Sequence, residues 1–232
     1  MIEAVKKIID EKIETLFNKQ ADPNDYDPAF TKSQNKSRYV LHTATIMHGQ
    51  MLEVAYLNSL KKELNDYIVW EDKSFKVSRD ALSVSTEQSD KRVLETFLPY
   101  GECVKIGNRE KKTQVDAIIY NNNTKKVTAF EIKRGGSHHD RQKKEKLLAD
   151  IIATQVLLKD YTVQKGYKVN DAKALLISHM GTQLLQPDWT HLQINGNKVN
   201  EYFGKDIIQH VTAAENYWIE KFNEEYKKLI SQ

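Results

Sequence analysis

The alternation of apolar and polar residues predicts two neighbouring strands in the middle of the chain, over residues 113–120 and 127–133. Both segments are rich in β-branched and aromatic side chains, and the polar run 121–126 between them has the composition of a turn. Two strands this close in sequence are most simply joined as an antiparallel hairpin. We therefore expect a β-hairpin at the centre of the fold.

The register of this hairpin decides which charged side chains meet. In one register, Tyr120 faces Val127 across the turn. Counting along both strands from that pair sets Asp116 directly opposite Glu131, and the strand period of two puts Lys133 on the same face. A tighter turn would make Glu131 the diagonal neighbour of Asp116, at roughly 7–8 Å between Cα atoms. In either register, the two carboxylates and the lysine share one patch.

Apolar residues at helical spacing predict several helices around the hairpin. These segments are 1–19, 46–64, 137–159 and 205–230. Residues 173–179 have the composition of a strand, so residues 127–179 are expected to form a β-α-β unit with parallel strands. The sequence thus predicts an α/β fold, with a central mixed β-sheet flanked by helices and with helical additions at both ends.

The length of 232 residues fits one domain with a substantial core. Within it we expect an N-terminal helix and connector over 1–37, a core over 38–179, and a hairpin with a C-terminal helix over 180–232. The pair Asn195 and Gly196 is typical of a type I′ turn. That turn would join strands at 189–194 and 198–203.

Charge and cysteine content restrict the class of protein. The net charge is only +3, so a basic surface must be local and offset by acidic surface elsewhere. The single cysteine, Cys103, excludes an intrachain disulfide framework and fits a reducing compartment. No apolar run approaches about 18 residues, and the charged N-terminus does not resemble a secretory signal. We expect a cytoplasmic protein with no membrane partner.

The facing carboxylates are the most informative chemical feature. Asp116 and Glu131 would repel each other and be costly to desolvate in an apolar strand pair unless a cation neutralised them. Mg²⁺ binds one or two carboxylates together with waters and phosphate oxygens, and it can activate one of those waters. Lys133 would orient that water or neutralise charge that develops on the phosphate. The pattern indicates a metal-dependent phosphodiesterase, and the alternative is an edge hairpin whose charges are solvated.

The pattern resembles the PD-(D/E)XK nuclease superfamily, the fold of many restriction endonucleases. That family has an Asp, a hairpin turn and then Glu-x-Lys, and this chain has Val115-Asp116, fourteen intervening residues and Glu131-Ile132-Lys133. Val115 replaces the Pro that often precedes the first Asp. The resemblance implies a restriction-endonuclease-like core in which Asp116, Glu131 and the Ile132 carbonyl bind Mg²⁺, with Mn²⁺ also accepted. It also implies that Lys133 assists the attacking water.

The family tends to add a carboxylate from a helix that precedes the sheet. Glu53 fits, because it lies on an apolar helical stripe, and it would complete the metal shell directly or through a water. The alternative is that Glu53 lies at the margin of the stripe and reaches solvent. Gln155, on the helix after the hairpin, is a looser match to a polar group that related nucleases hold near the metal.

Candidate DNA contacts flank the catalytic hairpin and combine groups that bind phosphates or base edges. They are Lys111, Lys112, Gln114, Arg134, Ser137, His138, His139 and Arg141. Lys36 and Arg38 lie in the polar segment 31–39, which a solvated linker explains equally well. Adjacent histidines point to different sides of a helix, so zinc is disfavoured at His138 and His139.

These observations predict a Mg²⁺-dependent DNA endonuclease, most like a type II restriction enzyme that recognises a short duplex sequence. One site per chain and two strands to cut imply a homodimer on a two-fold symmetric target. A restriction role would also imply a companion methyltransferase acting on the same sequence. A junction resolvase, a repair nuclease or a phage-defence nuclease would use the same site. A non-catalytic DNA-binding module and an acidic protein-interaction domain are alternatives from other classes.

Overall fold

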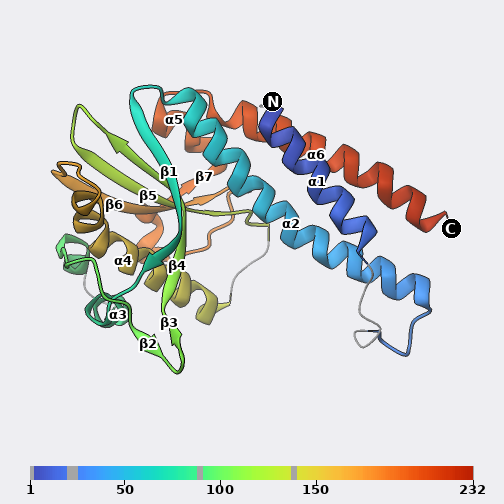
Figure 1. The fold of residues 1–232 in the computed structure, drawn as a ribbon, viewed down its shortest axis with the longest axis horizontal. Coiled ribbons are helices and arrows are strands. Elements are labelled where there is room, and N and C mark those ends of the chain that lie inside the picture. The colour runs from blue at the N-terminus through green and yellow to red at the C-terminus, as the bar shows by residue number, and fades with distance from the viewer. Residues whose placement is uncertain (1–2, 20–25, 88–90, 137–139, 232) are drawn as a thin grey trace. The chain divides into compact units, whose positions relative to one another are not determined.

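The computed structural model describes residues 3–19, 26–87, 91–136 and 140–231 (Figure 1). The chain divides into two compact units. A helical unit comprises Met1–Ser59 and Asp206–Gln232, and a sheet unit comprises Leu60–Lys205. No helix among the described residues is both long enough and apolar enough to cross a membrane.

The helical unit consists of α1 (Glu3–Asn18), most of α2 (Lys32–Glu63) and α6 (Ile207–Ile230). The three helices expected from apolar spacing in these regions are confirmed. Buried residues Leu16, Val40 and Ala44 form a core, which is completed by partly buried side chains. The completing side chains are Phe17, Tyr39, Met47, Phe222, Tyr226 and Leu229.

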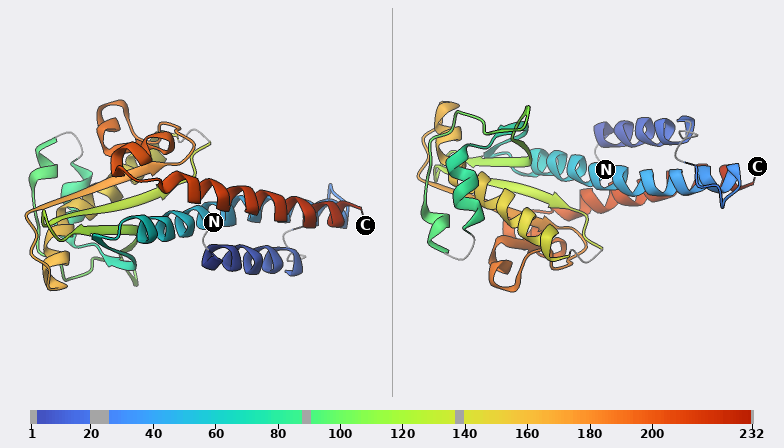
Figure 2. Two further views of the ribbon diagram at one scale, coloured as in Figure 1. Left: turned by 90° about the horizontal axis from the view of Figure 1, so that it is seen from above. Right: turned by 90° about the horizontal axis from the view of Figure 1, so that it is seen from below.

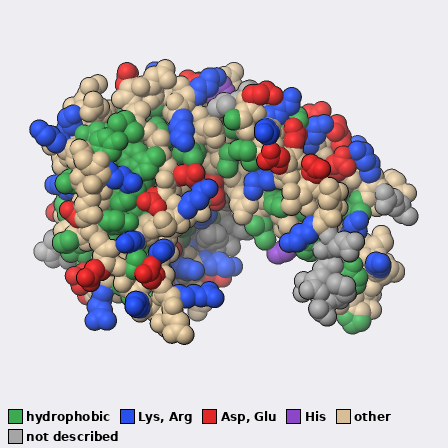
Figure 3. All heavy atoms as spheres, viewed as in Figure 1, with side chains coloured by type: hydrophobic (Ala, Val, Ile, Leu, Met, Phe, Trp, Pro, Cys, Tyr) green, Lys and Arg blue, Asp and Glu red, His purple; other side chains and the backbone are tan. Residues whose placement is uncertain are grey.

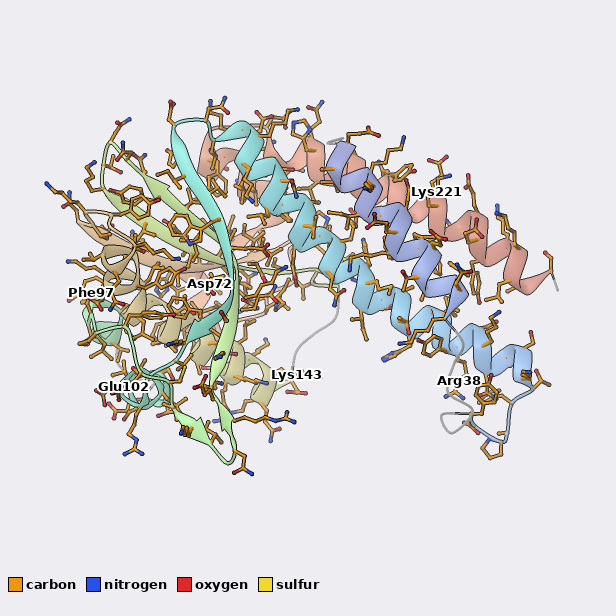
Figure 4. All side chains as sticks on the ribbon, in the orientation of Figure 1. Arg38, Asp72, Phe97, Glu102, Lys143 and Lys221 are labelled. Atoms are coloured by element: carbon orange, nitrogen blue, oxygen red, sulfur yellow. The ribbon has the colours of Figure 1, made fainter. Side chains whose placement is uncertain are left out.

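The segment 31–39 is not a loop, because α2 already begins at Lys32. Thr31 and Gln34 form a reciprocal pair: the Gln34 amide nitrogen donates to Thr31 Oγ1 at 3.3 Å, and the Thr31 amide nitrogen donates to Gln34 Oε1 at 2.8 Å. This arrangement is a capping box, which satisfies backbone donors at a helix start. Arg38, labelled in Figure 4, pairs with Asp27 at 3.1 Å. The expectation of a loop or linker here is therefore wrong.

The sheet unit contains a five-stranded sheet in the order β1-β4-β5-β6-β7. Its strands are β1 (Tyr67–Lys76), β4 (Lys112–Asn121), β5 (Lys126–Lys133), β6 (Asp171–Ser178) and β7 (Gln193–Asn195). β4 is antiparallel to both β1 and β5, whereas β6 is parallel to both β5 and β7. The predicted hairpin and the predicted mixed sheet with a parallel β-α-β unit are confirmed.

Helix α4 (Arg141–Gln164) connects β5 to β6 and packs against both strands, with α3 (Arg79–Thr86) beside it (Figure 2). The α4 residues against the sheet are almost continuously buried, which fits a helix covered on most sides. Elsewhere in the unit lie short helices η2 (Lys91–Glu95), η3 (Pro187–Leu192), η4 (Gly196–Lys198) and α5 (Val199–Phe203). A separate two-stranded ribbon consists of β2 (Lys105–Ile106) and β3 (Arg109–Glu110).

The predicted type I′ hairpin at Asn195 and Gly196 is wrong. Asn195 ends β7, which is parallel to β6, and Gly196 begins the short helix η4. A Cβ on Gly196 would lie 2.0 Å from the carbonyl oxygen of His179. The glycine is thus required by the close approach of two backbones rather than by a left-handed turn conformation.

Candidate active site

The hairpin of β4 and β5 has the first of the two predicted registers. Tyr120 pairs with Val127, and the ladder of paired residues extends to Ala117 and Phe130. One further step in this register would set Asp116 opposite Glu131, and the charge of Asp116 does act on Glu131. The acid pair therefore lies where the regular ladder ends.

Asp116 lies at a β-bulge between β1 and β4. Glu71 of β1 stands against two residues of β4, Asp116 and Ala117. The flanking pairs are Trp70 with Ile118 and Asp72 with Val115. A bulge interrupts the alternation of side chains between the two faces of a sheet and can redirect one of them. The local backbone of β4 is thus irregular at the carboxylate that the sequence singles out.

Strand β1 is held against α4 by a partly buried polar contact. Asp72, labelled in Figure 4, accepts a hydrogen bond from the Tyr161 hydroxyl at 2.7 Å. The Trp70 indole nitrogen donates to the same hydroxyl oxygen at 3.2 Å. These contacts fix β1 on both sides of Glu71, the residue at the bulge.

The carboxylate of Asp116 is buried, with 4% of the residue exposed, and it is held by two donors. The Ile132 amide nitrogen donates to Oδ2 at 2.7 Å, and the Gln114 Nε2 donates to Oδ1 at 2.8 Å. Burial raises the pKa of Asp116, whereas the positive charge of Lys133 and these two hydrogen bonds act to lower it. The side chain is therefore fixed in orientation but carries an unfavourable charge.

Glu131 is half-buried and forms an ion pair with Lys133, two residues along the same strand. Burial, and secondly the negative charge of Asp116, raise the pKa of Glu131 to about 7, although Lys133 opposes the shift. Two carboxylates and one lysine leave this cluster with excess negative charge when all are ionised. A hard cation would relieve that excess.

Two further carboxylates lie near the pair and were missed by the sequence interpretation. Asp150 of α4 raises the pKa of Glu131 through its charge, and both residues line a cavity of about 10 Å³, room for roughly one water. Glu71 of β1 raises the pKa of Asp116 in the same way. The apolar and aromatic run before Glu71 could have indicated the strand. Asp150 lies among buried apolar residues of α4, and this pattern could have indicated that its carboxylate faces the sheet.

The donor set fits a hard divalent ion better than zinc. Asp116 and Glu131 could supply carboxylate oxygens, and Ile132, next to Glu131 on β5, could supply a backbone carbonyl. Within the described ranges, no group of three or more His, Cys, Asp and Glu side chains is arranged to hold a metal. Mg²⁺ commonly needs only one or two carboxylates, because waters and substrate oxygens complete its shell, whereas zinc sites favour nitrogen and sulfur ligands.

The other predicted site residues are distributed differently. Glu53 lies half-buried on α2 and belongs to the helical unit, whereas the acid pair belongs to the sheet unit, so its place in the metal shell stays a prediction. Gln155 is buried: its Nε2 donates to the Leu94 carbonyl at 2.9 Å, and its Oε1 accepts from the Ala174 amide at 2.8 Å. These bonds account for a polar side chain in the core and link α4 to η2 and β6.

Several predicted DNA contacts already bind acidic side chains of this chain. Lys111 pairs with Asp150 at 3.6 Å, Lys112 with Glu110 at 3.0 Å, and Arg141 with Glu145 at 2.7 Å. Arg134 directly follows β5 and is half-buried. Lys36 and Arg38 lie on α2 of the helical unit, and Ser137, His138 and His139 lie outside the described residues. A phosphate would have to compete with these ion pairs at Lys111, Lys112 and Arg141.

Comparison of the chain with models of protein families, with curated proteins and with solved structures found no match. Because a fold class alone does not define an activity, function has to be argued from the chemistry of the site.

Proposed function

We propose that this protein is a Mg²⁺-dependent DNA endonuclease with a restriction-endonuclease-like core. The observation that carries the proposal is the proximity of Asp116 and Glu131 beyond the last regular pair of the β4 and β5 ladder. The charge of Asp116 raises the pKa of Glu131, and Lys133 forms an ion pair with Glu131. Two carboxylates and a lysine thus lie together, one on β4 and two on β5. Burying two like charges side by side lowers the stability of the fold, so a purely structural role does not explain the arrangement.

Each group has a distinct chemical role in this proposal. Asp116 and Glu131, with the carbonyl of Ile132, would hold Mg²⁺. The ion would act as a Lewis acid and lower the pKa of a bound water. Lys133 would orient the attacking water or neutralise negative charge on the phosphate. The hydrogen bond from the Ile132 amide keeps Asp116 oriented.

The raised pKa values favour a catalytic role over an acidic protein-interaction surface. Surface carboxylates that bind a basic partner are normally solvated and ionised. Here, burial raises the pKa of both Asp116 and Glu131, so the cluster is poised to exchange protons for a cation. A purely structural ion pair with Lys133 would need only one carboxylate, whereas two carboxylates lie here.

The specific form we propose is a type II restriction enzyme acting on double-stranded DNA as a homodimer, with a companion methyltransferase. The test is cleavage of a long, unmethylated duplex by purified protein in Mg²⁺, beside Asp116→Asn and Lys133→Ala. Lys126→Ala is the matched control, because Lys126 is the lysine at the other end of β5 and also pairs with an acid, Asp171.

Discrete fragments from the wild type and from Lys126→Ala, but not from the two site variants, would support the restriction role. A smear would favour a non-specific nuclease, and cutting only of branched substrates would favour a junction resolvase. Cleavage that persists in both site variants, or no cleavage with any DNA and Mg²⁺ or Mn²⁺, would refute the proposed site.

A further inference from the structure

The ribbon of β2 and β3 is a small exposed hairpin that precedes β4 directly. Lys105 pairs with Glu110 and Ile106 with Arg109, so the connection contains only Gly107 and Asn108. Gly107 has a φ of +60°, as the first central position of a type II′ turn requires. All six residues from 105 to 110 are exposed, and the ribbon extends beyond the lower end of β4 in Figure 1.

Backbone hydrogen bonds fix the base of the ribbon. The Lys111 amide donates to the Val104 carbonyl at 2.7 Å, and the Val104 amide donates to the Val77 carbonyl at 2.9 Å. The Val77 amide in turn donates to the Lys111 carbonyl at 3.1 Å. The exposed tip is thus presented on an anchored base, which is the arrangement expected of a recognition element rather than of a loose linker.

The tip carries side chains suited to reading base edges. Arg can donate two hydrogen bonds to guanine, Asn can pair with adenine, and an apolar side chain can contact the thymine methyl group. Arg109 and Asn108 supply the first two groups, and Ile106, 56% exposed, supplies the third. Among the described residues, Arg109 has no ion-pair partner, in contrast to Lys111 and Lys112.

The surroundings of the tip are mainly basic. Lys105, Lys111 and Lys112 lie next to it, with Glu110 as the one acid of the ribbon. Figure 3, in the orientation of Figure 1, shows several Lys or Arg side chains along the lower edge of the sheet unit, with acidic side chains among them. A polyanion is therefore the partner whose charge complements this edge.

The distance between the ribbon and the acid pair is compatible with both contacting one DNA duplex. Arg109 precedes Asp116 by seven residues in nearly continuous extended chain. At roughly 3.3 Å per residue, the two positions are at most about 23 Å apart, which corresponds to about seven base pairs of B-form DNA. Base contacts from the ribbon would fall within one helical turn of the phosphate at the acid pair.

We propose that the β2–β3 ribbon enters the major groove of duplex DNA and determines sequence preference through Asn108 and Arg109, with Ile106 in apolar contact beside them. The major groove is wide enough for a two-stranded ribbon. This inference rests on the proposed function, because it names how a DNA endonuclease of this kind would choose its site. It assigns recognition to residues that take no part in hydrolysis.

The test is selection of sequences from a random duplex pool by the full-length Asp116→Asn protein, which we expect to bind DNA without cutting it. The same selection is made with Asn108→Ala and Arg109→Ala added, and with Lys126→Ala added as an exposed control at the opposite end of β4 and β5. We expect each tip variant to lose discrimination at one base position by roughly 5- to 150-fold. The Lys126→Ala control should retain the full preference.

Contact in the major groove has its own signature. Guanine N7 in the selected sequence should be protected from dimethyl sulfate by the Asp116→Asn protein, and Arg109→Ala should remove that protection. Unchanged preference in both tip variants, or binding without any preference, would overturn the inference even if the wild type cleaves DNA. Tip-dependent preference without cleavage would refute only the proposed function. Absence of DNA binding would refute both.

Discussion

The backbone amide of Ile132 donates a hydrogen bond of 2.7 Å to Oδ2 of Asp116, so the catalytic candidate on β4 is tied to the strand that carries Glu131 and Lys133. The bond lies just beyond the last regular pair of the ladder, Ala117 with Phe130. A side chain thus continues the connection between the strands where backbone pairing stops. This gives Asp116 a structural role in addition to the proposed chemical one.

The two roles of Asp116 can be separated by comparing Asp116→Asn with Asp116→Ala. Both changes remove the charge and should lower Mg²⁺-dependent cleavage by roughly 100-fold or more. Only the alanine leaves the buried Ile132 amide without its acceptor, which should make that variant less stable than the asparagine by about 1–3 kcal/mol. Urea denaturation measures the difference, and equal stabilities would show that the bond contributes nothing.

Stability without metal should fall as the pH rises. The pKa of Glu131 is raised from 4.5 to about 7 in the folded protein, so between these values the folded state binds more protons than the unfolded state. At about 1.4 kcal/mol per pKa unit, this difference corresponds to about 3 kcal/mol lost between pH 4.5 and pH 7. Denaturation at pH 5 and pH 8 in EDTA should show the loss.

Glu131→Gln should lack this pH-dependent loss because it cannot ionise. A comparison of the variant with the wild type across the same pH range isolates the contribution of Glu131 from those of other groups. If the two proteins lose stability in parallel, the raised pKa of Glu131 is not the cause.

Mg²⁺ binding should release a proton near neutral pH. The ion competes with the proton that the raised pKa retains on Glu131, so affinity should increase as the pH rises toward and past about 7. The increase in Tm on adding Mg²⁺ should accordingly be larger at pH 8 than at pH 6. Calorimetric titration in two buffers of different ionisation enthalpy measures the proton directly, and an identical heat in both buffers would contradict the prediction.

Gly196→Ala should destabilise the sheet unit. Its Cβ would meet the His179 carbonyl oxygen at 2.0 Å, so two backbone segments would have to separate, at a cost of about 2 kcal/mol or more. Gly49→Ala is the control, because Gly49 lies within α2 and its added Cβ meets nothing within 4 Å. Alanine there should stabilise the protein by roughly 0.5–1 kcal/mol. Equal unfolding free energies for the two variants would refute the close-approach explanation.

The part of the site that could be predicted from sequence is the part set by local rules. The turn at 121–126 and strand alternation determine the register of β4 and β5, and this register ends one residue short of Asp116 and Glu131, which lie close together. The bulge opposite Glu71 depends instead on pairing with a strand some forty residues earlier, and strand alternation within β4 does not reveal it. Asp150 likewise reaches the acid pair only through the packing of α4 on the sheet.

Two errors in the expected fold have equally specific causes. Asn195 and Gly196 match a turn motif, but tertiary proximity to His179 accounts for the glycine. The polar composition of 31–39 indicated a loop, although Thr31 and Gln34 together satisfy the start of α2. In both places, specific contacts outweigh the general preference of the residues.

Strand β5 is the third of five strands, and all eight of its residues are paired with β6. Amide hydrogens on such a central strand exchange with solvent only when a large part of the surrounding structure opens. Glu131 and Lys133 therefore reside in the segment expected to open last. Heat inactivation of the site should coincide with cooperative unfolding of the sheet unit, and no partly melted state should retain a folded sheet while losing the acid pair.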